Sequence, residues 1–301
     1  MEFTHLSGKT VVVTGGSDGV GKAAVEAFVV AGANVVIIGR NEAKTAAAAH
    51  AIMTRTGRRA VTWEIADLSR RDSVIDVAAR LRARLPCINV LVNNAGAIFL
   101  DRQMTADGFE RTFALNHLHY FLLTLLLLDR LAAAAASGAP ARVLCVSSRA
   151  HMNARLNLDD VQLEHGYSGW RAYANSKLCN ILFTQALARR LDPSKCVVQA
   201  MHPGLVSTRF ATNNGVIGRV LRRLMDMVSI TAAAGADTLV WLADADDARV
   251  DSGSYWVKRK RTMPSTAARN HEYAERLWHQ STSLSTIDAD ALIMAARMSR
   301  P

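Results

Sequence analysis

The chain has 301 residues, of which 50% are hydrophobic, 6% aromatic and 21% charged. This composition is that of a folded globular protein, and it excludes collagen-like, intrinsically disordered and disulfide-stapled chains. The 36 Lys and Arg residues exceed the 26 Asp and Glu residues, which gives a net charge of +10. Such an excess suits nucleic acid, an acidic membrane surface or a phosphate-rich cofactor. Because no nucleic-acid-binding motif accompanies the charge, we expect no nucleic-acid partner.

The cysteines and the N-terminus indicate a reduced protein that is not exported. Cys87, Cys145, Cys179 and Cys196 form no CxxC pair and no Cys/His cluster at metal-ligand spacing, so we expect free thiols and no metal site. The N-terminus runs directly into a strand-like segment without the features of a secretory signal. The longest apolar run, residues 117–128, is too short to span a membrane. We therefore expect a cytoplasmic protein with no membrane span.

Short β-branched runs alternate with helical stretches along the chain. The predicted strands are TVVVT (10–14), NVVII (34–38), AVTWEI (60–65), INVLVN (88–93), ARVLCVS (141–147), CVVQAMH (196–202) and SGSYWV (252–257). Repeated βαβ units predict parallel strands joined by right-handed crossover helices. The expected fold is α/β, with a Rossmann-type doubly wound parallel sheet of about seven strands in a single domain over residues 1–301.

The first strand leads into the glycine-rich turn TGGSDGVG at residues 14–21. Glycines between a strand and a helix let the backbone approach a pyrophosphate, and the helix N-terminus offers N–H groups to it. The spacing departs from strict GxGxxG, so an ordinary tight turn is the alternative. The residues expected at the phosphates are Gly15, Ser17, Asp18, Gly19, Val20 and Gly21.

The second strand ends at Gly39, and Arg40 and Asn41 follow it. An NAD-binding fold places Asp or Glu at this point, about twenty residues beyond the glycines, where the carboxylate binds the ribose hydroxyls. Arg40 can instead pair with a 2′-phosphate through its planar guanidinium. The alternative is a solvent-facing arginine at the start of a helix. We predict NADP(H) as the cofactor, with Arg40 and Asn41 beside it.

Tyr173 and Lys177 are four residues apart in a stretch with helical character. Tyrosine has a pKa of about 10 in water, so it acts as an acid or base near neutral pH only when its phenolate is stabilised. Lys177, one helical turn further on, supplies a positive charge on the same face. The alternative is an exposed pair of polar residues.

Together with Asp67-Leu68, NNAG (93–96), Asn116, Ser147-Ser148 and HPGLVST (202–208), these motifs resemble the short-chain dehydrogenase/reductase family over nearly the whole chain. The segments SSRAH, YANSKLCNILFTQALARRL and NHEYAERLW are similar to its retinol dehydrogenase and WW-domain oxidoreductase branch.

The resemblance implies roles for the catalytic residues. Tyr173 exchanges a proton with the substrate oxygen, and Ser148 donates a hydrogen bond to that oxygen. Lys177 also holds the nicotinamide ribose, and Asn116 orders a water in the proton relay. Ser147 is adjacent to Ser148 and could take its place, but we favour Ser148.

The resemblance also implies further contacts with the cofactor. Asp67 accepts a hydrogen bond from the adenine, and the turn after the fourth strand passes the adenine ribose. The segment after the sixth strand binds the carboxamide or the phosphates. Loop residues without ligand contact are the alternative at each position. The further cofactor residues are Asp67, Leu68, Asn94, Ala95, Gly96, Pro203, Gly204, Val206 and Thr208.

Two segments are expected to shape the substrate pocket. Residues 149–171, between Ser148 and Tyr173, form an insert that we expect to be one wall of the pocket. Residues 205–230 interrupt the βα alternation and are predicted to be a substrate-binding lid. Within the insert, we favour a structural or surface role for His151 over a catalytic one.

We predict an NADP(H)-dependent oxidoreductase that interconverts a ketone or aldehyde and an alcohol on a lipophilic or polycyclic small molecule, such as a secondary metabolite. The alternatives are a redox-neutral epimerase or dehydratase that uses the same relay, and a non-catalytic NADP(H)-binding protein. The apolar helices around residues 116–131 and 171–190 predict a homodimer or homotetramer.

Overall fold

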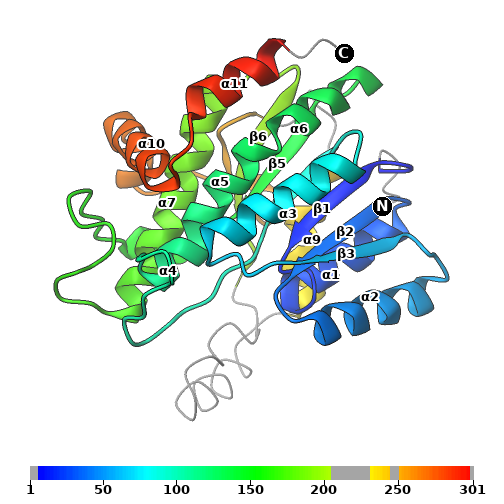
Figure 1. Cartoon of the computed structure of the whole chain (residues 1–301), viewed down its shortest axis with the longest axis horizontal. Helices are drawn as coiled ribbons and strands as arrows, with labels where there is room; N and C mark the ends of the chain where they lie inside the picture. Colours follow the sequence, from blue (N-terminus) through cyan, green and yellow to red (C-terminus); the bar gives the residue numbers. More distant parts are fainter. Residues whose placement is uncertain (1–5, 205–230, 245–250, 299–301) are drawn as a thin grey trace.

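The structure, a computed structural model, describes residues 6–204, 231–244 and 251–298. Its centre is an eight-stranded sheet with the order β3-β2-β1-β4-β5-β6-β7-β8 (Figure 1). Neighbouring strands are parallel except for the antiparallel pair β7 and β8. The predicted α/β fold is confirmed. The strands are β1 (Thr10–Thr14), β2 (Asn34–Gly39), β3 (Val61–Ile65), β4 (Val90–Asn93), β5 (Ala141–Val146), β6 (Cys196–His202), β7 (Tyr255–Val257) and β8 (Lys260–Arg261).

All seven predicted strands form, and the structure adds β8 at the edge of the sheet. A tight turn joins β7 to β8, with positive φ angles of 50° at Lys258 and 58° at Arg259. Two consecutive residues with positive φ give the turn that best matches the twist of a hairpin. The strand escapes prediction because its two residues are exposed and basic, without the apolar alternation that marks a strand.

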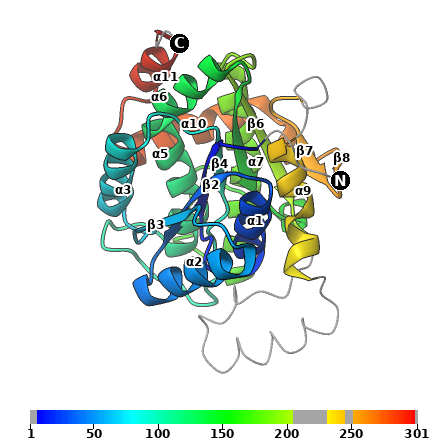
Figure 2. The same cartoon turned by 90° about the vertical axis from the view of Figure 1, so that its right-hand side faces the viewer.

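Helices cover both faces of the sheet, as the two views show (Figure 2). The helices α1, α2 and α9 pack on one face around Val25, Ile52 and Leu239. The helices α3, α5 and α7 pack on the other face. The larger helices are α1 (Gly19–Val30), α2 (Glu42–Thr56), α3 (Arg71–Arg84), α5 (His119–Leu126), α6 (Leu128–Ala134), α7 (Gly169–Arg190), α9 (Ala232–Asp244), α10 (His271–Ser285) and α11 (Ala289–Met298).

The order of the strands reverses between β1 and β4, which is the switch point of the sheet. The chain leaves β1 to build β2 and β3 on one side, and it returns to place β4 on the other. In open α/β sheets, ligands bind outside the carboxyl ends of the strands at such a switch point. The fold therefore directs attention to the loops that follow β1, β4, β5 and β6.

A third layer, α10 and α11, lies against α5, α6 and α7 (Figure 1). The Trp278 ring of α10 stacks at 6.3 Å on Phe183 and meets Phe121 edge-on at 5.0 Å. The Arg190 guanidinium lies 4.1 Å from the Trp278 ring centroid and is paired with Glu275 at 2.6 Å. An aromatic cluster, flanked by the Arg190–Glu275 ion pair, thus holds α10 against the core.

This third layer weakens the reason for which an oligomer was predicted. The sequence argument was that the helices near residues 116–131 and 171–190 carry more apolar surface than one face against a sheet requires. In the structure, α10 and α11 of the same chain cover part of that surface. Association into a homodimer or homotetramer stays a prediction, and the surplus apolar residues no longer require a second copy.

Replacing Trp278 with alanine should destabilise the fold, because the change removes the centre of the cluster under α10. We expect the free energy of unfolding to fall by about 3–5 kcal/mol, as for other buried aromatic residues. Urea denaturation measures the change, and Trp170→Ala is the control because Trp170 is 48% exposed. A loss below about 1 kcal/mol for Trp278→Ala would show that α10 is not firmly attached.

Stability should also fall in acid, because His117 and His119 are buried without charge. Burial lowers the pKa of both residues from 6.5 to about 3. The unfolded chain binds these protons below pH 6.5 while the folded chain excludes them down to about pH 3, so acid favours unfolding in this window. Each proton contributes about 1.4 kcal/mol per pH unit. We expect the free energy of unfolding, measured by urea denaturation at several pH values in this range, to change less steeply with pH in His119→Leu than in the unaltered protein. An equal dependence on pH in the two proteins would contradict the assignment.

Candidate active site

A cavity of about 1420 Å³ lies at the carboxyl edge of the sheet. It extends from the glycine turn after β1 to the first half of α7. Most of the predicted cofactor and catalytic residues line it, while Asn41 and Asn116 do not. Val206 and Thr208, and the predicted lid at 205–230, lie outside the described residues. The predicted residues that line the cavity are Gly15, Ser17, Asp18, Gly19, Val20, Gly21, Arg40, Asp67, Leu68, Asn94, Ala95, Gly96, Ser148, Tyr173, Lys177, Pro203 and Gly204.

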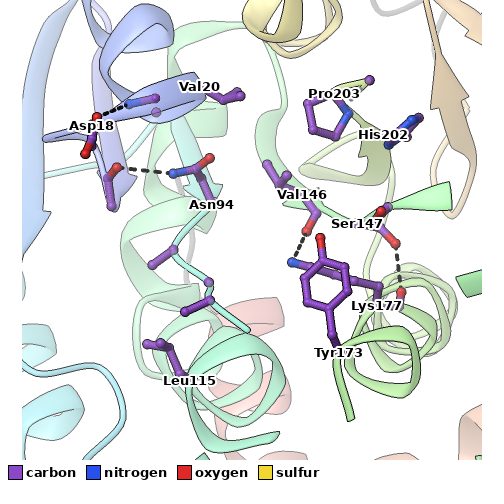
Figure 3. A pocket seen from close by; sticks show the side chains of 18 of the residues that line it. Asp18, Val20, Asn94, Leu115, Val146, Ser147, Tyr173, Lys177, His202 and Pro203 are labelled. Carbon is purple, nitrogen blue, oxygen red and sulfur yellow. Dashed lines mark hydrogen bonds between the residues drawn. The ribbon is translucent and has the colours of Figure 1, made fainter. Parts of the chain in front are cut away.

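Tyr173 and Lys177 project from α7 into the cavity (Figure 3). The Lys177 ammonium lies 5.7 Å from the Tyr173 ring centroid and donates to the Val146 carbonyl at 3.0 Å. Burial lowers the pKa of Lys177 to about 8. Burial also raises the pKa of Tyr173, and the hydrogen bond with Ser148 opposes this increase. Ser148 therefore favours the tyrosinate, while burial favours the neutral tyrosine.

The two adjacent serines have different surroundings. The Ser147 hydroxyl donates to the Lys177 carbonyl at 2.7 Å and is buried, which ties β5 to α7. The Ser148 hydroxyl is hydrogen-bonded to Tyr173 and also accepts from the Ala150 N–H at 3.2 Å. Of the two serines, Ser148 is the one that acts on the pKa of Tyr173.

Asn116 lies behind the cavity in a π-helical turn, Ala114–Leu118. Its amide exchanges two hydrogen bonds of 2.9 Å with the backbone of Ala97 and donates to Ser176 Oγ at 3.0 Å. These bonds occupy the side chain, so it fixes the loop after β4 instead of facing the cavity. A Cβ atom at Gly96 would lie 3.1 Å from Asn116 Oδ1 and 3.4 Å from the Lys177 ammonium, which explains the glycine.

The glycine turn after β1 is joined to the loop after β4. The Thr14 hydroxyl accepts from the N–H groups of Asn94 and Ala95 at 2.8 and 2.9 Å, and Asn94 Nδ2 donates to the Thr14 carbonyl at 2.8 Å. A Cβ atom at Gly21 would lie 2.5 Å from both Asn94 Nδ2 and the Gly15 carbonyl oxygen. Only glycine fits there, so α1 begins close against the turn.

Three predicted cofactor residues have structural partners. Asp18 caps α1 by accepting from the Gly19 N–H at 2.8 Å, and its other oxygen pairs with Lys44 at 2.7 Å. Asn41 caps α2 by accepting from the Lys44 N–H at 2.8 Å, which is why it faces the helix instead of the cavity. Asp67 accepts from both the N–H and the hydroxyl of Ser69.

Several cavity residues were absent from the sequence predictions. Lys44 lies four residues after Arg40, in the first turn of α2, and its closeness in the sequence could have indicated a second cation. Trp170 precedes Tyr173 by three residues, a spacing that places both on one side of α7. Arg149, Asn153 and Trp170 come from the insert at 149–171 and line the cavity.

Two expected absences can be compared with the described residues. In residues 6–204, 231–244 and 251–298, no group of three His, Cys, Asp or Glu side chains could hold a metal ion. Within the same ranges, no single helix is long and apolar enough to span a membrane. The segments Arg111–Leu126 and Leu128–Ala134 together have the length and composition of a span, but the chain bends by 59° between them.

A model of the short chain dehydrogenase family matches residues 9–215. The chain belongs to this family. Retinol dehydrogenase 12 from Homo sapiens is 39% identical over 280 residues, covering 93% of this chain and 87% of the relative. "Putative daunorubicin C-13 ketoreductase DnrU" from Streptomyces sp. (strain C5) is 36% identical over 279 residues, covering 92% and 93%. This short-chain dehydrogenase thus lies in the retinol dehydrogenase-like branch, as the sequence predicted.

Solved structures agree with the fold. A protein from Mycobacterium paratuberculosis is 32% identical and superimposes with a TM-score of 0.76, covering 95% of this chain and 96% of that one. A protein from Beutenbergia cavernae, crystallised with NADP at low occupancy, is 25% identical with a TM-score of 0.66, covering 85% and 96%. The short-chain dehydrogenase fold therefore extends over nearly the whole chain.

Proposed function

We propose that this short-chain dehydrogenase interconverts a ketone or aldehyde and an alcohol on a lipophilic small molecule in the cytoplasm, with NADP(H) as cofactor. The observation that carries the proposal is that Tyr173, Ser148 and Lys177 line the same cavity as the glycine turn. A proton donor and a dinucleotide cradle in one cavity are the two parts that carbonyl reduction needs.

The residues present fit a dinucleotide. The close approach of Gly15, Gly21 and Asn94 leaves no room for a side chain at position 21 and keeps the backbone accessible beside the cavity. The N-terminus of α1 adds N–H groups and a favourable dipole for a pyrophosphate. When bound, NADP(H) supplies or accepts the hydride at the substrate carbon.

Side chains of the protein transfer the proton to and from the substrate oxygen. In reduction, the Tyr173 hydroxyl donates its proton to the substrate oxygen, while Ser148 hydrogen-bonds the same oxygen. The tyrosinate that remains is stabilised by the Ser148 hydroxyl and by the charge of Lys177, held near the ring by the Val146 carbonyl. In oxidation, the tyrosinate removes the proton from the alcohol. Asn116 supports this arrangement by fixing the backbone of Ala97.

The cofactor preference rests on two cations at the adenosine end. Arg40 and Lys44 both line the cavity after β2. Lys44 is paired with Asp18, and both side chains are about two-fifths exposed, at 42% and 40%. An ion pair this exposed is weak, so the lysine can leave the aspartate for a phosphate at little cost.

The substrate class rests on the cavity wall and on the relatives. Leu115, Val146, Trp170 and Val257 give the cavity apolar side chains, and Trp170 comes from the insert. The names of the relatives refer to retinol and to daunorubicin, both of which are lipophilic. We infer a substrate with an extended apolar body and one carbonyl or hydroxyl group at Tyr173. Reduction of a retinoid aldehyde or a polycyclic ketone by NADPH is the direct test.

Tyr173→Phe should abolish most turnover with such a substrate, because it removes the proton donor and preserves the ring. We expect kcat to fall by about 10²–10⁴-fold while the Kd for NADPH changes little. Stopped-flow absorbance of NADPH and fluorescence titration measure the two quantities. Tyr273→Phe is the matched control, since Tyr273 lies on α10 away from the cavity. Turnover near the wild-type rate in a folded Tyr173→Phe protein would refute the mechanism.

Arg40→Ala should weaken NADPH binding by about 10–100-fold and leave NADH binding nearly unchanged, since it removes a charge-assisted contact with the 2′-phosphate. Lys44→Ala should also weaken NADPH binding selectively, but by a smaller factor, because Lys44 has to give up its ion pair with Asp18 to reach the phosphate. Calorimetric titration of both cofactors into each variant gives the affinities. Equal affinities of the wild-type protein for NADPH and NADH would overturn the cofactor assignment.

A further inference from the structure

His151 is buried in the first turn of the insert, the short 3-10 helix Arg149–Asn153. It does not line the catalytic cavity. Its Nδ1 lies 2.7 Å from the Ser148 carbonyl oxygen, and its Nε2 lies 3.2 Å from the Ser265 nitrogen. A carbonyl oxygen only accepts and a peptide N–H only donates, so the ring carries its proton on Nδ1 and a lone pair on Nε2. The two contacts fix one neutral tautomer.

The contact with Ser148 reaches the residue that faces Tyr173. The Ser148 carbonyl accepts from both the backbone N–H of His151, at 3.1 Å, and its ring. The Ser148 hydroxyl accepts from the Ala150 N–H at 3.2 Å and is hydrogen-bonded to Tyr173. Carbonyl and hydroxyl are thus both held by the same short turn, so a change in the turn that releases the carbonyl would also move the Ala150 N–H that holds the hydroxyl.

The other side of the ring is attached to the distant end of the chain. Ser265 lies 114 positions further along the sequence and follows β8. The Ser265 hydroxyl accepts from the Ala268 N–H at 3.2 Å, which holds the segment in place. The His151 ring also meets Tyr255 of β7 edge-on at 5.0 Å. The imidazole therefore bridges the end of β5 and the segment that follows the sheet.

The groups around His151 keep it neutral. Burial lowers the pKa of His151 below its usual value. The titratable and charged neighbours are Arg149 on its own turn, His202 at the end of β6 and Tyr255 on β7. The Nδ1 atom of His202 accepts from the Arg149 N–H at 3.4 Å, so His202 holds the same turn from the other side. No carboxylate is among these neighbours in the described residues.

We propose that His151 is a positioning residue that holds the Ser148 hydroxyl against Tyr173 by fixing the Ser148 carbonyl. The inference rests on the proposed function, because it assigns a role in the reaction of Tyr173. This role explains why a buried imidazole next to the proposed catalytic serine has one hydrogen-bond acceptor and one hydrogen-bond donor as its partners. It also places a determinant of catalysis outside the cavity.

Two conservative variants separate the two bonds. The amide nitrogen of asparagine reaches the place of Nδ1, so His151→Asn keeps the donor to the Ser148 carbonyl and loses the acceptor for Ser265. Glutamine reaches the place of Nε2, so His151→Gln keeps the acceptor for Ser265 and loses the donor to Ser148. We expect His151→Asn to retain most of kcat and His151→Gln to lower kcat by up to about 10-fold, the worth of one hydrogen bond.

The pH dependence of kcat distinguishes positioning from a loss of stability. The Ser148 hydrogen bond lowers the pKa of Tyr173, so displacement of that hydroxyl should move the tyrosine limb of the profile to higher pH. His151→Gln and Ser148→Ala should both show this shift, and His151→Asn should not. Because the two changes remove the same bond, adding His151→Gln to Ser148→Ala should change kcat no further.

The measurements are the pH profiles of kcat, the Kd for NADPH and the thermal unfolding of each variant. Wild-type kcat and profile in folded His151→Gln, or additive losses in the double variant, would overturn the proposal. If His151→Gln does not fold, His151→Asn decides alone: a reduced kcat or a shifted profile in that variant refutes the role. If Tyr173→Phe stays active, the proposed function fails first, and this result separates the two failures.

Discussion

A single carbonyl oxygen, that of Val146 at the end of β5, organises the catalytic half of the molecule. It accepts from the Lys177 ammonium at 3.0 Å, and from the Asn180 amide and the Tyr120 hydroxyl at 3.4 Å each. Two of these donors are on α7 and one is on α5, so the carbonyl fixes both helices against the strand. The distance between Tyr173 on α7 and Ser148 beyond β5 follows from this anchorage. A buried ammonium is costly without acceptors, which makes the arrangement rigid as well as specific.

The cofactor half depends on a corresponding junction at the switch point of the sheet. Thr14 and Asn94 join the ends of β1 and β4 through hydroxyl, amide and backbone groups. Gly21 then allows α1 to approach these loops at a distance that a side chain would prevent. The two halves meet at Asn116, whose amide holds the loop after β4 and reaches Ser176 on α7. Thr14 and Asn116, which do not line the cavity, thus set the positions of residues that do.

The sequence predicts the sheet well because its central strands are buried on both faces and are mostly apolar along their length. All six residues of β5 and all seven of β6 are buried, for example. Most of the motif residues are also predictable, since they follow the ends of strands or, like Tyr173 and Lys177, lie one turn apart on a helix. The partners of polar side chains are not, because they depend on tertiary contacts. Asn116 bonds the backbone of Ala97, 19 residues away, and Lys44 pairs with an aspartate 26 residues away.

The same limit explains why the role of His151 and the covering of α7 could not be read from the sequence. The partner of His151 is 114 residues away, and Trp278 meets Phe183 and Phe121 across a comparable separation. Local periodicity identifies an apolar helix face but gives no information on what covers it. Only the assembled third layer shows that the chain provides its own cover.

That cover has a consequence for biosynthesis. A chain leaving the ribosome completes every strand of the sheet before residues 271–285, which form α10, have been made. Until then, Phe121 and Phe183 lack the Trp278 ring that covers them and present aromatic surface to water. Exposed apolar surface in a partly folded chain promotes aggregation and is a target of chaperones. The nascent enzyme is therefore most vulnerable in the interval between the completion of its sheet and the docking of α10.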